Sequence, residues 1–328
     1  MDGTDIGVTC VLTSVWITVG YTIDEMGVLS GGGASSAMDL NGLEKRDQVV
    51  GTSDNIHAVM WEHRATKPPT LVNLERDYCE AAPESSALGI NNTSWVVGVH
   101  SSGPDQVSPV LYEMTGCTAL STLPEMSGLP PSYGEAWSVN DSGTIVGWSV
   151  DDSGNRRACR WTSPLGVWEV ASLGTLGGLT SAAFRISQSG TIVGRADIAD
   201  GVEHAFLWTT SAGMQDIHSG PGASVAHGVN WYDEVVGELI PAGQPASAFR
   251  WSSSAQMQVL PGLPGSTVAG SAATAINDHG VVVGRSNTGD PYPVYPHAVY
   301  WPASDQPGFS LTAQLLPNLG LSPVIGCR

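Results

Sequence analysis

The amino-acid sequence predicts an all-β fold, a six-bladed β-propeller whose blades are four-stranded antiparallel sheets. One pattern recurs six times: an aliphatic residue followed by Asn or Ser, a turn, a β-branched-Val-Gly triplet, and a five-residue run that usually closes on Trp. The aliphatic anchors lie 43 to 50 residues apart, the length of one propeller blade; they are Leu40, Ile90, Val139, Ile186, Val229 and Ile276. A seven-bladed ring, with a composite blade from residues 8–23 and 310–325, is the main alternative.

The repeats span nearly the whole chain, so its 328 residues predict a single domain, 1–328. Residues 1–33 are expected to be an N-terminal closing segment and residues 317–328 a C-terminal tail. The expected blades cover about residues 34–75, 84–124, 133–172, 180–218, 223–260 and 270–316. A ring must hide its final sheet edge. We therefore expect residues 21–27 to pair with residues 310–316.

The first strand of each repeat carries alanine at a fixed place, as expected where inner strands crowd near a propeller axis. These alanines are Ala37, Ala87, Ala136, Ala183, Ala226 and Ala273. The strand ends in Asn or Ser and is followed by turns such as Asp141-Ser142-Gly143. Asn, Asp and Gly tolerate a positive φ and suit tight hairpins. The first strand is thus expected to return directly as the second.

The β-branched residues of the second strand are expected to fill the space between sheets, while its glycine permits close packing. The third strand carries one large ring, which we interpret as a wedge between neighbouring sheets and not as a ligand-stacking surface. The rings are Trp61, Tyr112, Trp161, Trp208, Trp251 and Trp301. The fourth strand has the least regular pattern, as expected of an outer strand that faces water.

The fourth repeat contains Leu173-Gly174-Thr175-Leu176-Gly177-Gly178, Ile192-Val193-Gly194 and His204-Ala205-Phe206-Leu207-Trp208. These segments resemble the bacterial extracellular-repeat family named for its His-Ala-Phe tripeptide (HAF repeat), over about residues 21–320. The second repeat departs from the family pattern, with Ser108-Pro109-Val110-Leu111-Tyr112 in place of the tripeptide. The resemblance implies a propeller-like, exported bacterial protein, secreted or at the cell surface, with a cytoplasmic location left open. It implies no activity and no catalytic residues.

The composition limits the partners of this chain. Its formal net charge is -18, and Lys45 and Lys67 are its only lysines. Because binding to phosphates depends on Lys and Arg, we expect neither nucleic acid nor an anionic membrane as a partner. No hydrolase elbow, phosphate loop, His-Glu-x-x-His helix or Cys-x-x-Cys pair occurs, so we expect no cofactor and no metal. The expected oligomeric state is a monomer.

Five cysteines cannot all pair with one another. Cys79 and Cys117 bracket the second repeat, and Cys10 and Cys327 lie near opposite chain ends, so two disulfides are predicted between these pairs. Cys159 occupies a central apolar place of its repeat and is expected to be an inert buried thiol. The alternative is that all five cysteines are reduced.

Two places in the repeat vary widely from copy to copy and are therefore not dictated by packing. One directly follows the second-strand glycine: Thr52, Val99, Trp148, Arg195, Glu238 and Arg285. The other directly follows the first-strand alanine: Met38, Leu88, Trp137, Phe184, His227 and Thr274. We expect a ligand site at the mouth of a central channel, lined by Trp137, Trp148, Phe184, Arg195, His227, Glu238 and Arg285. A ligand carboxylate would suit Arg195 and Arg285; alternatively, Arg195, Glu238 and Arg285 form salt links that seal the channel.

Three hypotheses for the function follow. The first is a binding module that recognises a small molecule, glycan or protein. The second is a propeller enzyme, a lyase, hydrolase or cyclase, in which Glu238 orients His227 as the general base. The third is a structural surface protein. By contrast, His57, His204 and His297 recur at one place of the repeat, which favours a structural hydrogen bond to a neighbouring loop over catalysis.

Overall fold

The computed structural model describes residues 28–29, 33–41, 47–54, 56–64, 67–74, 84–103, 106–113, 121–122, 133–218, 220–263, 270–287, 296–303 and 314–315. The chain groups into two compact units. The first unit contains residues 1–155, 159–172 and 328, and the second contains residues 156–158 and 173–327. Among the described residues, no helix is long and apolar enough to span a membrane. The segment 21–27, predicted to close the ring, lies outside these ranges, so that closure stays a prediction.

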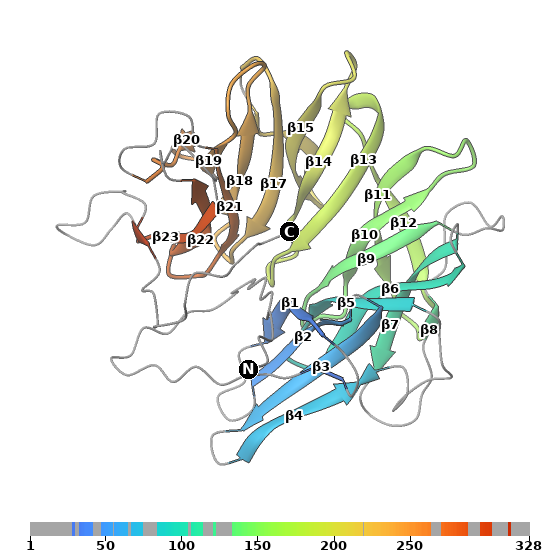
Figure 1. The fold of residues 1–328 in the computed structure, drawn as a ribbon. Coiled ribbons are helices and arrows are strands. Elements are labelled where there is room, and N and C mark those ends of the chain that lie inside the picture. Colours follow the sequence, from blue (N-terminus) through green and yellow to red (C-terminus); the bar gives the residue numbers. More distant parts are fainter. Residues whose placement is uncertain are drawn as a thin grey trace. The chain divides into compact units, whose positions relative to one another are not determined.

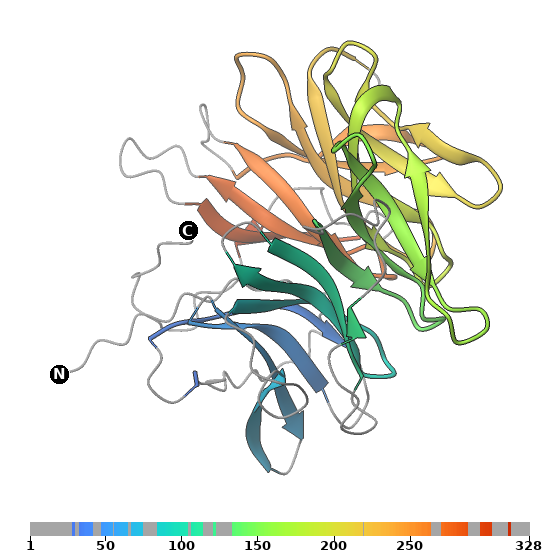
Figure 2. The same cartoon turned by 90° about the vertical axis from the view of Figure 1, so that its right-hand side faces the viewer.

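The described residues form six four-stranded antiparallel sheets, which confirms the predicted all-β, six-bladed propeller class. In each sheet the strands pair in sequence order, as successive hairpins (Figure 1, Figure 2). The first sheet contains β1 (Ser35–Asn41), β2 (Asp47–Ser53), β3 (His57–Arg64) and β4 (Lys67–Asn73). The second contains β5 (Glu84–Ile90), β6 (Trp95–Gly103), β7 (Gln106–Glu113) and β8 (Ser121–Thr122). The third contains β9 (Gly134–Val139), β10 (Ile145–Val150), β11 (Arg156–Thr162) and β12 (Glu169–Gly174).

The second unit holds the remaining three sheets. The fourth sheet contains β13 (Gly177–Ile186), β14 (Ile192–Ile198), β15 (Glu203–Thr209) and β16 (Gly213–Asp216). The fifth contains β17 (Ala223–Val229), β18 (Val235–Ile240), β19 (Ser247–Ser252) and β20 (Gln256–Val259). The sixth contains β21 (Ser271–Ile276), β22 (Val282–Asn287), β23 (Pro296–Trp301) and β24 (Gln314–Leu315). β24 pairs with β23 in the sixth sheet. Residues 8–23 of the alternative seventh blade lie outside the described ranges.

Every first strand contains a β-bulge at the same place, directly after the repeated alanine. The strand pairing skips one residue there in all six sheets. The skipped residues are Met38, Leu88, Trp137, Phe184, His227 and Thr274, the same set that varies from repeat to repeat. Since a bulge residue stands outside the ladder pairing, it re-aims its side chain. The variable place of the repeat is therefore a bulge in all six sheets.

The bulge also explains the glycine of the second strand. A Cβ at Gly51, Gly98, Gly147, Gly194, Gly237 or Gly284 would lie 1.9 to 2.1 Å from a carbonyl oxygen of the paired first strand. No side chain fits at that distance. The close packing predicted for this glycine is confirmed, and its cause is the approach of the two backbones next to the bulge.

Apolar side chains from neighbouring sheets meet in shared cores within each unit. Tyr112 of the second sheet packs in one cluster with Met60 of the first, and Trp301 of the sixth packs with Val236 of the fifth. Both rings are fully buried, which confirms the wedge interpretation for them. Trp208 and Trp251, at the same place of the fourth and fifth sheets, are only partly buried.

Of the five cysteines, Cys159 lies among the described residues. Cys159 is a free, fully buried cysteine in the core that the second and third sheets share, as predicted for an inert thiol. Burial raises the pKa of this thiol well above its usual value, so the reactive thiolate is disfavoured. The other four cysteines, of the predicted pairs Cys10–Cys327 and Cys79–Cys117, lie outside the described residues.

The asparagine that ends the first strand does more than form its turn. Oδ1 of Asn91 accepts the amides of Thr93 and Trp95, and its Nδ2 donates to the carbonyl oxygen of Asn140 in the next sheet at 3.0 Å. Asn41 bonds to Asn91 in the same way at 3.0 Å, and Asn230 to Asn277 at 3.2 Å. The repeated asparagine thus fastens each of these sheets to the next one.

A second repeated hydrogen bond explains why the second repeat departs from the tripeptide pattern. In four repeats, the amide of the third-strand alanine donates at 2.8 to 2.9 Å to a serine Oγ at the next first strand; the pairs are Ala58–Ser85, Ala158–Ser181, Ala205–Ser224 and Ala248–Ser271. In the second repeat Pro109 has no amide hydrogen to donate. The facing position is Gly134, where a Cβ would lie 3.3 Å from Cδ of Pro109. The second repeat therefore lacks both the amide donor, at Pro109, and the serine acceptor, at Gly134.

Candidate functional site

Five of the seven predicted site residues lie in the second unit, on three consecutive sheets. The bulges of β13 and β17 carry Phe184 and His227. Arg195, Glu238 and Arg285 directly follow the glycines of β14, β18 and β22. Each of these three residues is paired with the residue that precedes the first-strand alanine, next to the bulge. The backbone is therefore the same at these places in all three sheets, while the side chains that it carries differ from sheet to sheet.

These five side chains form one continuous series of contacts. The guanidinium of Arg195 lies over the ring of Phe184, with 5.8 Å between Cζ and the ring centroid. The rings of Phe184 and His227 stack at 6.2 Å with 28° between their planes. Nε2 of His227 lies 3.3 Å from Oε1 of Glu238, and Nη2 of Arg285 lies 3.8 Å from Oε2 of the same carboxylate. The structure thus brings together the residues that the sequence selected in this unit.

Charge around Glu238 sets the electrostatics of the site. The hydrogen bond from His227 is the main cause that lowers the pKa of Glu238; burial opposes it, and the charges of His227 and Arg285 add to the lowering. Glu238 is therefore held as a carboxylate, although only 17% of its side chain is exposed. The side chain of Arg285 is 62% exposed, so its guanidinium is largely open to solvent.

Arg195 has a partner that the sequence reasoning missed. Its Nη1 donates to Oε2 of Glu203 at 2.8 Å. Arg195 faces Ala205 on β15, and Glu203 lies two residues from Ala205 on the same strand. Diagonal neighbours on paired strands reach one another through long side chains. The pairing register of β14 and β15 would therefore have predicted this ion pair. The salt links of the alternative hypothesis form in part: Arg285 approaches Glu238, whereas Arg195 pairs with Glu203.

The two predicted tryptophans belong to the first unit and share one acceptor. Trp137 is the bulge residue of β9, and Trp148 follows the glycine of β10. Nε1 of Trp137 and Nε1 of Trp148 both donate to Oε2 of Glu135, at 2.8 and 2.9 Å. Glu135 was not predicted; it lies two residues before Trp137, on the same side of the strand. Its carboxylate fixes the orientation of both indoles.

The histidine at the recurring place of the fourth repeat makes a structural contact. Nδ1 of His204 lies 2.7 Å from Oδ2 of Asp216, on the adjacent strand β16 instead of the neighbouring loop expected from the sequence. The ring of His218 lies 4.4 Å from that of His204. Burial, and next the proximity of His204, lower the pKa of His218. Within the described part of the chain, no three metal-ligating side chains are placed to hold a metal ion.

Comparison with known proteins supports the fold and no family. No family model and no curated protein matches the chain, so the HAF-repeat resemblance remains a resemblance. The chain is similar to the crystal structure of TolB from Acinetobacter baumannii, with a TM-score of 0.50, 11% identity and coverage of 78% of this chain and 61% of that one. A putative TolB from Agrobacterium tumefaciens has a TM-score of 0.48 and 13% identity, covering 68% and 79%. The lectin SapL1, solved with alpha methyl fucoside, has a TM-score of 0.47 and 9% identity, covering 87% and 97%. At these identities the similarity concerns the fold alone.

Proposed function

We propose that this protein is a binding module that takes a small, carboxylate-bearing molecule at the site of Phe184, Arg195, His227, Glu238 and Arg285. The observation that carries the proposal is the continuous series of contacts among these five side chains on three consecutive sheets. The fold demands none of them, because the same places hold other residues in the other repeats. Proteins that share a fold differ in function through residues that the fold itself does not require.

The charges of the site favour an anionic ligand group beside a flat apolar one. The charge of Arg195 is matched by Glu203, and Glu238 is shared between His227 and Arg285. Arg285 is the exposed cation of the set, and a guanidinium binds a carboxylate with two parallel hydrogen bonds. The stacked rings of Phe184 and His227 offer an aromatic surface next to it. We infer an aromatic or otherwise planar carboxylate as the ligand class.

Titration calorimetry and thermal shift against benzoate, indole-3-acetate, cinnamate and citrate test this proposal. Binding raises the melting temperature with ligand concentration. Arg285→Gln should weaken binding by about 10- to 150-fold, as expected for the loss of a charged hydrogen bond worth about 1.5 to 3 kcal/mol. Arg156→Gln, at an exposed arginine of β11, is the matched control and should bind as the wild type does. Equal affinities in wild type, Arg285→Gln and His227→Ala would refute the proposed site.

A second candidate function is catalysis by the same site. Its supporting observation is the 3.3 Å separation of His227 Nε2 and Glu238 Oε1, since a carboxylate can orient an imidazole that acts as general base. With a substrate in hand, His227→Ala and Glu238→Gln should abolish turnover and leave binding measurable. A purely structural surface protein is the outcome in which no ligand binds. The secreted or cell-surface location stays a prediction, which fractionation of the source cells would test.

A further inference from the structure

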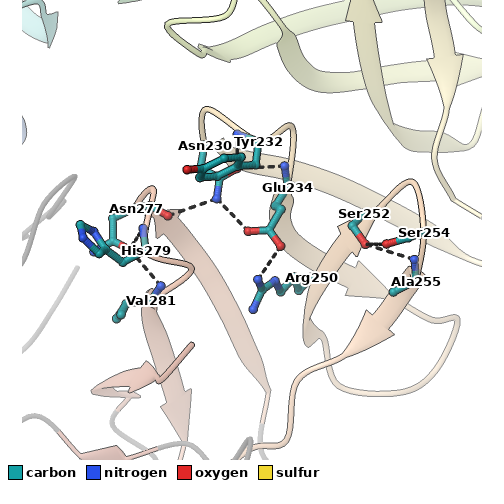
Figure 3. A network of polar contacts seen from close by, with 10 residues as sticks. All are labelled: Asn230, Tyr232, Glu234, Arg250, Ser252, Ser254, Ala255, Asn277, His279 and Val281. Carbon is teal, nitrogen blue, oxygen red and sulfur yellow. Dashed lines mark hydrogen bonds and ion pairs between the residues drawn. The ribbon is translucent and has the colours of Figure 1, made fainter. Parts of the chain in front are cut away.

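A hollow of about 200 Å³ opens at one end of the fifth sheet, where the β17–β18 and β19–β20 turns lie. Its lining is mostly polar: Glu234, Arg250, Ser252, Ser254, Gln256 and Gln258 line it together with Ala255 and Leu260. None of these residues belongs to the site of Phe184 and His227. In Figure 3 the Arg250 side chain lies between three turns, those carrying Glu234, Ala255 and His279.

A mostly buried ion pair forms the wall of the hollow. Nη2 of Arg250 donates to Oε1 of Glu234, and Oε2 of Glu234 accepts from Nδ2 of Asn230 at 2.8 Å. A Cβ at Gly280 of the neighbouring turn would lie 3.1 Å from Nη2 of Arg250, so the guanidinium packs directly against that turn. Among the residues that the structure describes, Glu234 is the only acceptor of Arg250. Arg250 and Glu234 both line the hollow, so polar atoms of this pair that face it can bond to a ligand.

The turn that leads into Glu234 exposes two large aromatic residues. Trp231 is 53% exposed and Tyr232 is 70% exposed. The equivalent turns that the structure describes carry polar pairs at this place: Asn92-Thr93, Asp141-Ser142, Gln188-Ser189 and Asp278-His279. The turn is held in place, because the amide of Trp231 donates to Oδ1 of Asp278 at 2.8 Å. Packing therefore does not require aromatic rings at this place, and two adjacent exposed rings offer a surface for a ligand.

From these features we propose that the hollow and its aromatic turn bind a single neutral sugar ring. The charges of Arg250 and Glu234 neutralise each other, so this ion pair does not favour binding of an ion. It does present a hydrogen-bond donor beside an acceptor, and two neighbouring hydroxyl groups match that pattern because each hydroxyl both donates and accepts. The volume is below the roughly 300 to 1,000 Å³ of sites for drug-sized ligands, which limits the occupant to a small ring. Neither Trp231 nor Tyr232 lines the hollow itself. Because their turn ends at the lining residue Glu234, one of these exposed rings would cover the C–H face of the sugar from outside the hollow.

Saturation-transfer NMR and titration calorimetry on the full chain, with the methyl glycosides of glucose, galactose, mannose, fucose and N-acetylglucosamine, test the proposal. We expect at least one to bind. Trp231→Ala and Gln258→Ala, both at exposed side chains, should each weaken it by about tenfold or more. Leu165→Ala removes an exposed apolar side chain from the turn between β11 and β12 and is the matched control.

The result also separates this site from the carboxylate site. Arg285→Gln should leave glycoside binding unchanged, and benzoate should not compete with it. The proposal is overturned if none of the five glycosides binds at millimolar concentration, or if Trp231→Ala and Gln258→Ala bind as the wild type does. Loss of glycoside binding in Arg285→Gln would overturn it too, because the sugar would then occupy the other site.

Discussion

Replacing Gly237 by alanine adds one methyl group where β17 leaves no room for it. A Cβ at this position would lie 1.9 Å from the carbonyl oxygen of Val225 and 2.9 Å from Cε1 of Phe249. The carbonyl would have to retreat by about 1 Å to reach even a 3.0 Å contact, which disturbs the ladder next to the bulge. Overpacking costs about 1 to 3 kcal/mol, and a lost backbone hydrogen bond about 1 kcal/mol. We therefore expect the free energy of unfolding to fall by about 2 to 4 kcal/mol.

Urea denaturation followed by far-UV circular dichroism and tryptophan fluorescence measures this change. Gly270→Ala is the matched control in the same unit, because a Cβ there would have its nearest neighbour, the carbonyl oxygen of Ala246, at 3.6 Å. That variant should be unchanged or more stable by about 0.4 to 1 kcal/mol, as its unfolded chain has less conformational freedom. If Gly237→Ala unfolds within about 0.5 kcal/mol of the wild type, the steric account of the repeated glycine is wrong.

Three further predictions concern the hydrogen bond between sheets and the titrating groups. Asn91→Asp keeps the acceptor of the turn amides and loses the donor to Asn140, so urea denaturation should show a loss of about 0.5 to 1.5 kcal/mol. The pKa of Glu238 is lowered in the folded protein, so ionised Glu238 stabilises the fold above its unfolded pKa of about 4.3, and this contribution is lost as the pH falls through the folded pKa. The difference in unfolding free energy between wild type and Glu238→Gln should therefore shrink below about pH 4.3; a constant difference would contradict this. The pKa of His218 is also lowered, mainly by burial, so the unfolded chain binds its proton more readily and stability should fall as the pH drops below about 6.5. His218→Phe should flatten that slope in denaturation midpoints measured from pH 7.5 to 5.

The repeat made the architecture predictable, because equivalent residues recur at each blade period. The alanine, the turn and the Val-Gly pair identified the first two strands of all six sheets. The bulge was not predicted, because it changes the pairing register while every residue type along the strand stays compatible with a regular strand. The hydrogen bond between neighbouring sheets was also missed. The turn alone explains Asn91 in the sequence, whereas its bond to Asn140, 49 residues away, depends on how the two sheets pack.

The sequence could predict candidate site residues at the two places of the repeat where the residue type varies, because packing does not dictate the residue there. That reasoning selected Phe184, His227 and Glu238, which the structure places in contact. It missed Glu135 and Glu203, because neither lies at one of the two variable places that were compared. Their roles depend on strand register, which decides which carboxylate faces which tryptophan or arginine. A single sequence does not specify that register directly.

The bulge separates what the fold requires from what a ligand requires. The alanine and the glycine beside it are fixed by backbone contacts, whereas the bulge residue itself ranges from Met38 to Trp137 on the same frame. Replacing Phe184 by leucine, the natural bulge residue at Leu88, should therefore leave the unfolding free energy within about 1 kcal/mol of wild type. The same change removes the ring between Arg195 and His227, so affinity for a planar carboxylate should fall. Parallel calorimetry and urea denaturation measure both effects. A stability loss above about 2 kcal/mol would show instead that Phe184 belongs to the core and that its variation among the repeats reflects packing.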